Sequence, residues 1–189
     1  MTEHQPLTNS PLPVRLRTSD YLMLDEAGAF DGYGKTELIE GEVYYMNAQY
    51  RPHARVKSQL FFELAKALQD IEGLEAIVEG SVEIPPHNAP EPDIVVTDQP
   101  EGTGLIPLPS VRLVVEVSDT TLKNDLGRKA RIYAANGIPE YWVVDLAGER
   151  LHQMWSPDRD GYAEKREITF GETIGAMTVN GLSLILPAV

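Results

Sequence analysis

The sequence predicts an α/β fold, in which a mixed central β-sheet is flanked by helices and extended by antiparallel strands at both ends. From residue 53 onward, the apolar patterns give the order helix, strand, strand, strand, helix, strand. Two of these strands, over 93–98 and 111–118, are rich in apolar β-branched residues, as buried central strands are. The chain has 189 residues, 42% of them hydrophobic, which suits one domain with a substantial core.

The N-terminal region predicts a tail followed by a short helix. Residues 1–14 are polar and contain proline, so we expect a flexible tail ahead of a single domain over 15–189. Thr18 or Ser19 is the expected N-cap of a helix over 19–28, because acidic residues follow closely.

A hairpin and an amphipathic helix are expected next. The segment TELIEGEVYYMN predicts two short strands around a turn at Glu40 and Gly41. After Pro52, apolar residues recur along one face over 53–71, with the lysine and glutamate residues largely on other faces.

The second half of the chain alternates apolar runs with proline- or glycine-containing segments. The expected elements are one strand or two over 75–84, a loop over 85–92, buried strands over 93–98 and 111–118, a helix over 122–136 stopped by Gly137, a buried strand over 138–146, and a hairpin with a final edge strand over 149–187.

Composition argues against several classes of protein. The formal net charge of −13, from 29 acidic and 16 basic residues, counts against a dedicated nucleic-acid binder with a basic surface. A metal-dependent enzyme is compatible with this charge, because a bound cation can meet phosphate groups inside an acidic pocket. Cysteine is absent, which fits a cytoplasmic location. No apolar stretch is long enough to span a bilayer, so we expect no membrane partner.

Glu116 lies where a carboxylate is costly. Every neighbour from Leu113 to Val117 is apolar, so the charge of Glu116 needs a proton, a basic partner in the core, or a metal cation. If Asp93, at the start of another apolar strand, lies on the same side of a neighbouring strand, the two carboxylates converge. A divalent ion offsets their repulsion better than a single lysine does.

The available ligands indicate which metal would bind. Oxygen ligands, without cysteine or a tight histidine cluster, favour a hard ion such as Mg²⁺ or Mn²⁺. The expected ligands are Asp93, Glu116 and the backbone carbonyl of Val117.

The helix after this strand can bring a cation to the site. Asp125, Lys129 and Tyr133 follow at intervals of four residues and therefore share one face. Spacing alone favours an ordinary surface pair of Asp125 and Lys129 above a packed tyrosine. Because the helix leaves the strand end that carries Glu116, Lys129 can also lie near the metal and hold an attacking water or a developing phosphorane charge.

In this order, the residues resemble a known family. The matching residues are Pro92 and Asp93, the EVS of 116–118, then Asp125, Lys129 and Tyr133, and the GIPEYWVVD of 137–145. They are similar to a family of restriction endonuclease-like proteins of unknown biological role, which resembles the PD-(D/E)XK nuclease superfamily. TELIEGEV and His53 also look like its N-terminal pattern, so the resemblance covers about residues 18–150.

The resemblance implies a restriction endonuclease-like core in which Asp93 and Glu116 bind a divalent cation for hydrolysis of a phosphodiester bond in DNA. The superfamily signature places a lysine two positions after the acid, where this sequence has Ser118. In similar proteins the next helix can supply that lysine, and Lys129 is the candidate. The expected catalytic residues are therefore Asp93, Glu116 and Lys129.

Five more residues are candidates for the same pocket. They are Glu37, His53, Ser118, Asp125 and Tyr133. A solvated hairpin acid is the alternative for Glu37, and a structural or helix-start residue is the alternative for His53. Tyr133 can touch a substrate or pack against Trp142.

Two functions of different classes are open. The first is an Mg²⁺- or Mn²⁺-dependent endonuclease acting on DNA, although residue types do not separate DNA from RNA or another phosphate ester. The second is a non-catalytic interaction or regulatory module that keeps the nuclease fold, which the acidic balance and the lack of a basic, aromatic-interleaved segment favour. The hairpins at both ends can supply an interface for a homodimer.

Overall fold

The structure, a computed structural model, describes residues 12–185 and confirms the predicted α/β architecture. A six-stranded mixed sheet in the order β10-β9-β8-β7-β5-β3 forms its centre. These strands are β3 (Glu75–Val78), β5 (Ile94–Thr97), β7 (Val111–Ser118), β8 (Glu140–Asp145), β9 (Arg150–Pro157) and β10 (Tyr162–Thr169). β7 and β8 are parallel, and the other neighbours are antiparallel.

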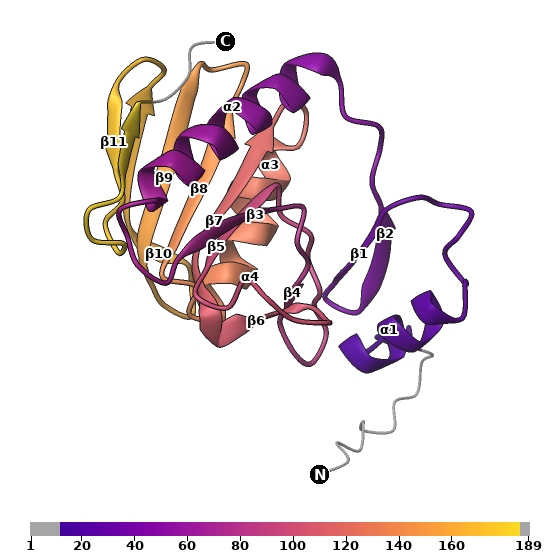
Figure 1. Ribbon diagram of the computed structural model, residues 1–189. Helices are drawn as coiled ribbons and strands as arrows, with labels where there is room; N and C mark the ends of the chain where they lie inside the picture. The colour runs from indigo at the N-terminus through magenta and orange to yellow at the C-terminus, as the bar shows by residue number, and fades with distance from the viewer. Residues whose placement is uncertain (1–11, 186–189) are drawn as a thin grey trace.

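Helices cover both faces of this sheet (Figure 1). The long helix α2 (Arg51–Leu68) crosses one face, and the other carries α3 (Leu122–Asn124), the π-helical turn η2 (Asp125–Lys129) and α4 (Ala130–Ala135). Within the described residues, no helix has the length and apolar character that crossing a membrane requires.

Alternate residues of β7 serve two hydrophobic cores. Val115 and Val117 pack on the α2 side with Leu60 and Leu64, whereas Val114 packs on the α4 side with residues of that helix. Successive side chains of a strand point to opposite faces, so Glu116 points to the α4 side. Both cores are closed by residues of β8, which explains why this strand is buried along its whole length.

Three small two-stranded sheets extend the domain. They are β1 (Thr36–Ile39) with β2 (Glu42–Tyr45), β4 (Val82–Glu83) with β6 (Ile106–Pro107), and β11 (Thr173–Gly175) with β12 (Ser183–Ile185). The predicted hairpin turn is confirmed, since Glu40 and Gly41 both have positive φ, at 51° and 81°. The two remaining elements are helix α1 (Thr18–Glu26) and the 3₁₀ turn η1 (Leu108–Ser110).

Several local expectations differ from the structure. The N-cap of α1 is Arg17, whose backbone N–H donates to the Asp20 carboxylate at 2.9 Å, so the predicted cap at Thr18 or Ser19 is wrong. The hydroxyl of Thr18 instead donates to the Asn88 carbonyl at 3.3 Å, which ties α1 to a loop. The predicted tail lies outside the described residues, apart from residues 12–14.

Two further differences concern the second half of the chain. The segment expected as one helix contains the π-helical turn η2, and such turns are frequent at functional sites. The final strand β12 is not at the edge of the central sheet, because it pairs only with β11. The strand pair β4 and β6 was not expected.

Glu140 is a fully buried carboxylate that joins the sheet to the C-terminal segment. Its Oε1 accepts hydrogen bonds from Trp142 Nε1 at 2.6 Å and Gln153 Nε2 at 2.5 Å. Its Oε2 accepts from the backbone N–H groups of Met177 and Thr178 at 2.8 and 2.9 Å, and from the Thr178 hydroxyl at 2.9 Å. This buried charge is balanced by five donors rather than by a lysine or arginine.

We expect Glu140→Gln to lower the free energy of unfolding by about 2–3 kcal/mol, because an NH₂ group would then face N–H donors in a fully buried site. Denaturant unfolding measures the loss. The exposed Glu164, on β10, provides the matched control Glu164→Gln, for which we expect a change within about 0.5 kcal/mol. Equal stability of the two variants would contradict this role for Glu140.

Candidate active site

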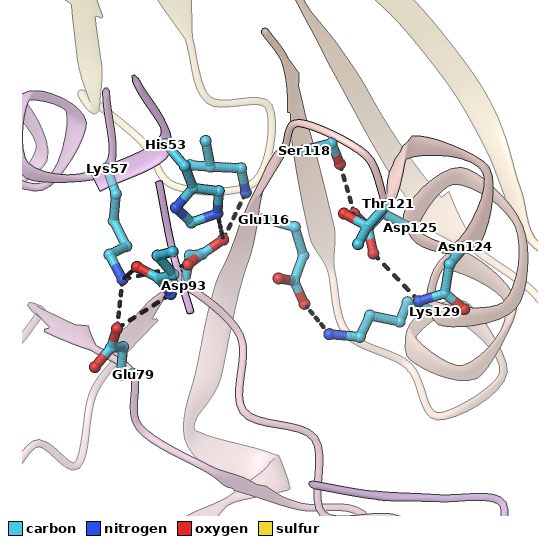
Figure 2. Close-up of polar contacts among 12 residues, drawn as sticks. His53, Lys57, Glu79, Asp93, Glu116, Ser118, Thr121, Asn124, Asp125 and Lys129 are labelled. Atoms are coloured by element: carbon cyan, nitrogen blue, oxygen red, sulfur yellow. Dashed lines mark hydrogen bonds and ion pairs between the residues drawn. The ribbon is translucent and has the colours of Figure 1, made fainter. Parts of the chain in front are cut away.

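The register of the sheet places Asp93 opposite Glu116. Ile94 at the start of β5 lies opposite Val115 in the antiparallel strand β7, so the next pair outward is Asp93 and Glu116. Asp93 contacts His53 and Lys57 of α2, whereas Glu116 contacts Lys129 and Tyr133 on the α4 side. Both residues line one cavity of about 760 Å³, and they lie next to each other in Figure 2. Both acids therefore border the same cavity, and their convergence on a shared ion stays a prediction.

Asp93 is held by three groups. Its Oδ2 accepts the Val117 backbone N–H at 2.8 Å and lies 3.3 Å from Nε2 of His53, and its Oδ1 lies 3.5 Å from Nζ of Lys57. Burial alone would raise the pKa of Asp93, but His53, the Val117 N–H and Lys57 outweigh it and leave this pKa below its usual value. Asp93 is therefore an ionised acceptor.

Glu116 is bound from the α4 side by two donors. Its Oε1 accepts from Lys129 Nζ at 2.9 Å and from the Tyr133 hydroxyl at 3.1 Å. Burial raises the pKa of Glu116 to about 8; Lys129 opposes this rise, whereas Asp125 and Asp93 add to it. Glu116 thus lies in an excess of negative charge, where an added cation is favoured.

Lys129 is the cation nearest to this acidic cluster. Besides Glu116, it pairs with Glu37 Oε2 at 3.2 Å. Burial lowers the pKa of Lys129, but the surrounding carboxylates outweigh burial and raise it above its usual value. Lys129 is therefore charged, and it points toward Glu116, as expected of the lysine that replaces the one missing at Ser118.

Asp125 organises the start of the helical segment. It is only 3% exposed and accepts hydrogen bonds from the Ser118 hydroxyl at 2.5 Å and the Thr121 hydroxyl at 2.6 Å. The interpretation of Asp125 and Lys129 as a surface pair is wrong, because both residues are buried. The Tyr141 hydroxyl donates to the Asp125 carbonyl at 3.2 Å, which satisfies a backbone group at the π-helical turn.

The candidate pocket residues separate into two groups. Glu37, His53 and Asp125 line the cavity with Asp93, Glu116 and Lys129, whereas Ser118 and Tyr133 are fully buried behind it. Tyr133 does not pack against Trp142, which belongs to the core on the opposite face of the sheet. The Tyr133 ring instead meets Tyr141 edge-on, with centroids 4.9 Å apart.

Sequence reasoning missed two residues of the site, Lys57 and Glu79. Lys57 is buried and contacts Glu79, Asp93 and the side-chain oxygen of Gln49, the last at 2.5 Å. The available signal was spacing, since Lys57 lies one turn after His53 on the stripe that continues to Leu60. Glu79 had no such signal. It directly follows β3 and itself has a positive φ of 55°, which sets the direction of its side chain.

The oxygen atoms around the acidic pair suit a hard divalent cation. Among residues 12–185, no three His, Cys, Asp or Glu side chains are grouped so that they alone could hold an ion. A backbone oxygen would be needed to complete a set of ligands. N–H and C=O of one residue in a strand point to the same side, so the Val117 carbonyl faces the same edge as its N–H, which binds Asp93. Asp93, Glu116 and this carbonyl fit Mg²⁺ or Mn²⁺, which retain water ligands.

Comparison with known proteins identifies the family of the chain. The model of the Uma2 family, described as "putative restriction endonuclease", matches residues 19–187. The chain belongs to the Uma2 family. The restriction endonuclease-like family expected from the sequence is thereby confirmed, and membership of Uma2 indicates a nuclease. No curated protein matches the chain.

A solved structure shares the fold of this Uma2 protein. It is described as a putative nuclease belonging to DUF820 from Anabaena variabilis ATCC 29413. The two align with a TM-score of 0.63 at 14% sequence identity, covering 90% of this chain and 95% of that chain. At this identity the likeness establishes the common fold.

Acidification should reveal the ion pairs of Glu79. Hydrogen bonds from Lys35 and Lys57 hold the pKa of Glu79 down at about 2, against its usual value of 4.5. A carboxylate with a lowered folded-state pKa stabilises the protein above its unfolded pKa and loses that contribution as the pH falls through the folded value. We expect the unfolding midpoint to drop between about pH 4.5 and pH 2, and to drop less in Glu79→Gln. Parallel pH profiles of the two proteins would contradict this.

Proposed function

We propose that this Uma2 protein is an Mg²⁺- or Mn²⁺-dependent endonuclease that hydrolyses phosphodiester bonds of DNA. One observation carries the proposal. Two buried carboxylates, Asp93 and Glu116, line one cavity, with the ammonium group of Lys129 2.9 Å from Glu116. Carboxylates can hold a cation that polarises a phosphate and activates a water for hydrolysis, and a nearby ammonium group can stabilise the charge that develops.

The proposed roles follow from the contacts of each residue. Asp93, Glu116 and the Val117 carbonyl would hold the cation, which supplies a polarised phosphate and an activated water when bound. The Val117 N–H fixes the orientation of the Asp93 carboxylate, and Tyr133 does the same for Glu116. Lys129 has a positive charge beside the carboxylates and would stabilise negative charge that develops on the phosphate.

The acidic composition is consistent with this proposal. Asp125 and Glu37 add negative charge around Glu116, so a phosphate group would be repelled from the cavity in the absence of a cation. Charge repulsion by a net charge of −13 is screened by salt. DNA binding should therefore depend on metal more strongly than it does in proteins with a basic surface.

The proposal is tested by incubating single-stranded, duplex and branched DNA, and RNA of the same sequence, with the protein and Mg²⁺ or Mn²⁺. We expect cleavage that EDTA abolishes. Asp93→Ala and Lys129→Ala should remove it. Equal residual cleavage by the wild type and both variants would indicate a contaminant and contradict the proposal.

The second candidate function is a non-catalytic interaction or regulatory module. One observation favours it, because both acids already have internal partners: Lys57 and His53 at Asp93, and Lys129 at Glu116. Calorimetry with Mg²⁺ and Mn²⁺ separates the two candidates. Binding at millimolar or lower metal concentration supports the nuclease, whereas no heat of binding at these concentrations supports the inert module.

A further inference from the structure

One segment supplies an unbroken stretch of the wall of the cavity. Residues 44–50, with the sequence YYMNAQY, connect strand β2 to helix α2, and all seven line the cavity that contains Asp93 and Glu116. Three of the seven are tyrosines with exposed fractions of 38% for Tyr44, 63% for Tyr45 and 73% for Tyr50. The acidic site is therefore bordered by three aromatic rings that are partly open to solvent.

Some of these rings are held at fixed places. The Arg128 guanidinium lies 4.9 Å from the centroid of the Tyr44 ring and also donates to its hydroxyl at 2.8 Å. Glu40 accepts from Arg128 at 2.8 Å and fixes the guanidinium in turn. The ring of Tyr45 lies beside that of Tyr33, with centroids 5.9 Å apart. Anchored aromatic side chains lose little entropy when they bind a ligand.

The charges around the rings select the kind of ligand. Arg128 and Lys129 are the lysine and arginine residues that line the cavity, and both are already paired with carboxylates. Duplex DNA is bound mainly through phosphate contacts, which need free cations. Stacking of bases on aromatic rings does not need them, and it tolerates any base sequence.

We propose that the tyrosine segment 44–50 binds unstacked bases of a single-stranded nucleic acid and presents the adjoining backbone to the acidic pair. This inference rests on the proposed nuclease function and specifies its substrate class. Bases in a duplex are stacked on each other and offer no free face to a tyrosine. The favoured substrates are therefore single strands, or single-stranded parts of branched molecules.

The test measures binding separately from cleavage. Fluorescence anisotropy is recorded in Mg²⁺ with three labelled probes of about 12 nucleotides: a single strand, the corresponding duplex, and a single strand with abasic sites. The protein carries Lys129→Met to suppress turnover. On this background we compare Tyr45→Leu with Tyr50→Leu combined, the conservative pair Tyr45→Phe with Tyr50→Phe, and the control Phe62→Leu. Phe62 is 65% exposed on α2 and does not line the cavity.

We expect the single strand to bind more tightly than the duplex or the abasic strand. The double leucine variant should bind the single strand about ten-fold more weakly, while the phenylalanine pair and Phe62→Leu retain the affinity. Equal affinity for the single and abasic strands, unchanged affinity of the leucine variant, or no binding of any probe would overturn the inference. Thermal unfolding of each variant shows that the fold is intact.

Cleavage by the protein with native Lys129 distinguishes the two proposals. If it cleaves duplex and single strands equally and the leucine variant is unaffected, the nuclease proposal stands and the tyrosine inference fails. If binding depends on Tyr45 and Tyr50 but no probe is cleaved, the nuclease proposal fails while the bases are still recognised by these rings.

Discussion

Replacing Lys129 with methionine should reduce metal-dependent cleavage by about 10²–10³-fold, the loss typical of removing one group that stabilises charge in a transition state. The methionine side chain has a similar length and fills the same buried space, so the packing beneath Tyr133 should persist. Asp93 and Glu116 both remain in this variant. Its affinity for Mn²⁺ should therefore fall less than its cleavage rate, which steady-state kinetics and calorimetry can compare directly.

The stability of Lys129→Met should depend on pH in a defined direction. Burial and nearby acids already raise the pKa of Glu116, and loss of Lys129 should raise it further. When the pKa of an acid is higher in the folded than in the unfolded protein, its contribution to stability is fully present below the unfolded pKa. This contribution is lost as the pH rises through the folded pKa. The variant should lose about 3 kcal/mol at alkaline pH and less near pH 5, where Glu116 is protonated.

Lys123→Met is the matched control for Lys129→Met. Lys123 lies on the adjacent helix α3, is exposed, and does not line the cavity. We expect unchanged cleavage and stability for this control. A loss of cleavage of similar size in Lys123→Met and Lys129→Met would mean that general surface charge, and not the pair with Glu116, accounts for the effect.

Asp93→Asn should weaken Mn²⁺ binding and cleavage by at least ~100-fold, because residues outside the ligand shell of metal sites already contribute 10–100-fold. Asparagine keeps the shape of the side chain, and its oxygen can still accept the Val117 N–H. It removes the charge that faces the metal and Lys57. The substitution therefore tests the negative charge of Asp93 while keeping the shape of its side chain. Unfolding measurements should show only a small change in stability.

Asp70→Asn controls for the loss of one negative charge. Asp70 is exposed beyond the end of α2 and does not line the cavity. Isothermal titration with Mn²⁺ should give equal affinities for this variant and the wild type. Retained Mn²⁺ affinity in Asp93→Asn would contradict the assignment of Asp93 as a ligand, even if cleavage were lost.

Much of the fold could be predicted because its strands are defined by local patterns. The strands that end just before Asp98 and at Ser118 are buried on both faces. Their apolar β-branched residues predict this burial. The hairpin turn at Glu40 and Gly41 likewise has a local cause. The pairing of β12 with β11 rather than with the central sheet could not be predicted, because short strands do not specify their partners.

The candidate site divides in the same way. Glu116 is a carboxylate within an apolar strand, so the sequence alone indicates that a partner is required. Its partner Lys129 was indicated by the position of the helix that follows the strand and by the resemblance, whereas spacing alone favoured a surface pair with Asp125. The roles of Lys57 and Glu79 depend on the approach of α2 to the strand end before β5, which is a tertiary contact without a sequence pattern.

Tyr133 shows why a correct helical face can still give a wrong packing partner. The face shared by Lys129 and Tyr133 was expected, and both side chains do reach Glu116. Trp142 and Tyr141 are neighbours in β8, and their side chains point to opposite faces of the sheet. The expected partner, Trp142, is therefore one residue away from the observed partner, Tyr141, and lies on the other face of the sheet.

The most direct test of the metal-dependent site is a crystal structure of the protein soaked in Mn²⁺, with anomalous scattering to locate the ion. We predict one Mn²⁺ bound by carboxylate oxygens of Asp93 and Glu116 and by the Val117 carbonyl, with Lys129 beside it and Lys57 moved from Asp93 toward Glu79. A fully soaked crystal with the Asp93–Lys57 and Glu116–Lys129 contacts intact and no ion between the two acids would contradict this account.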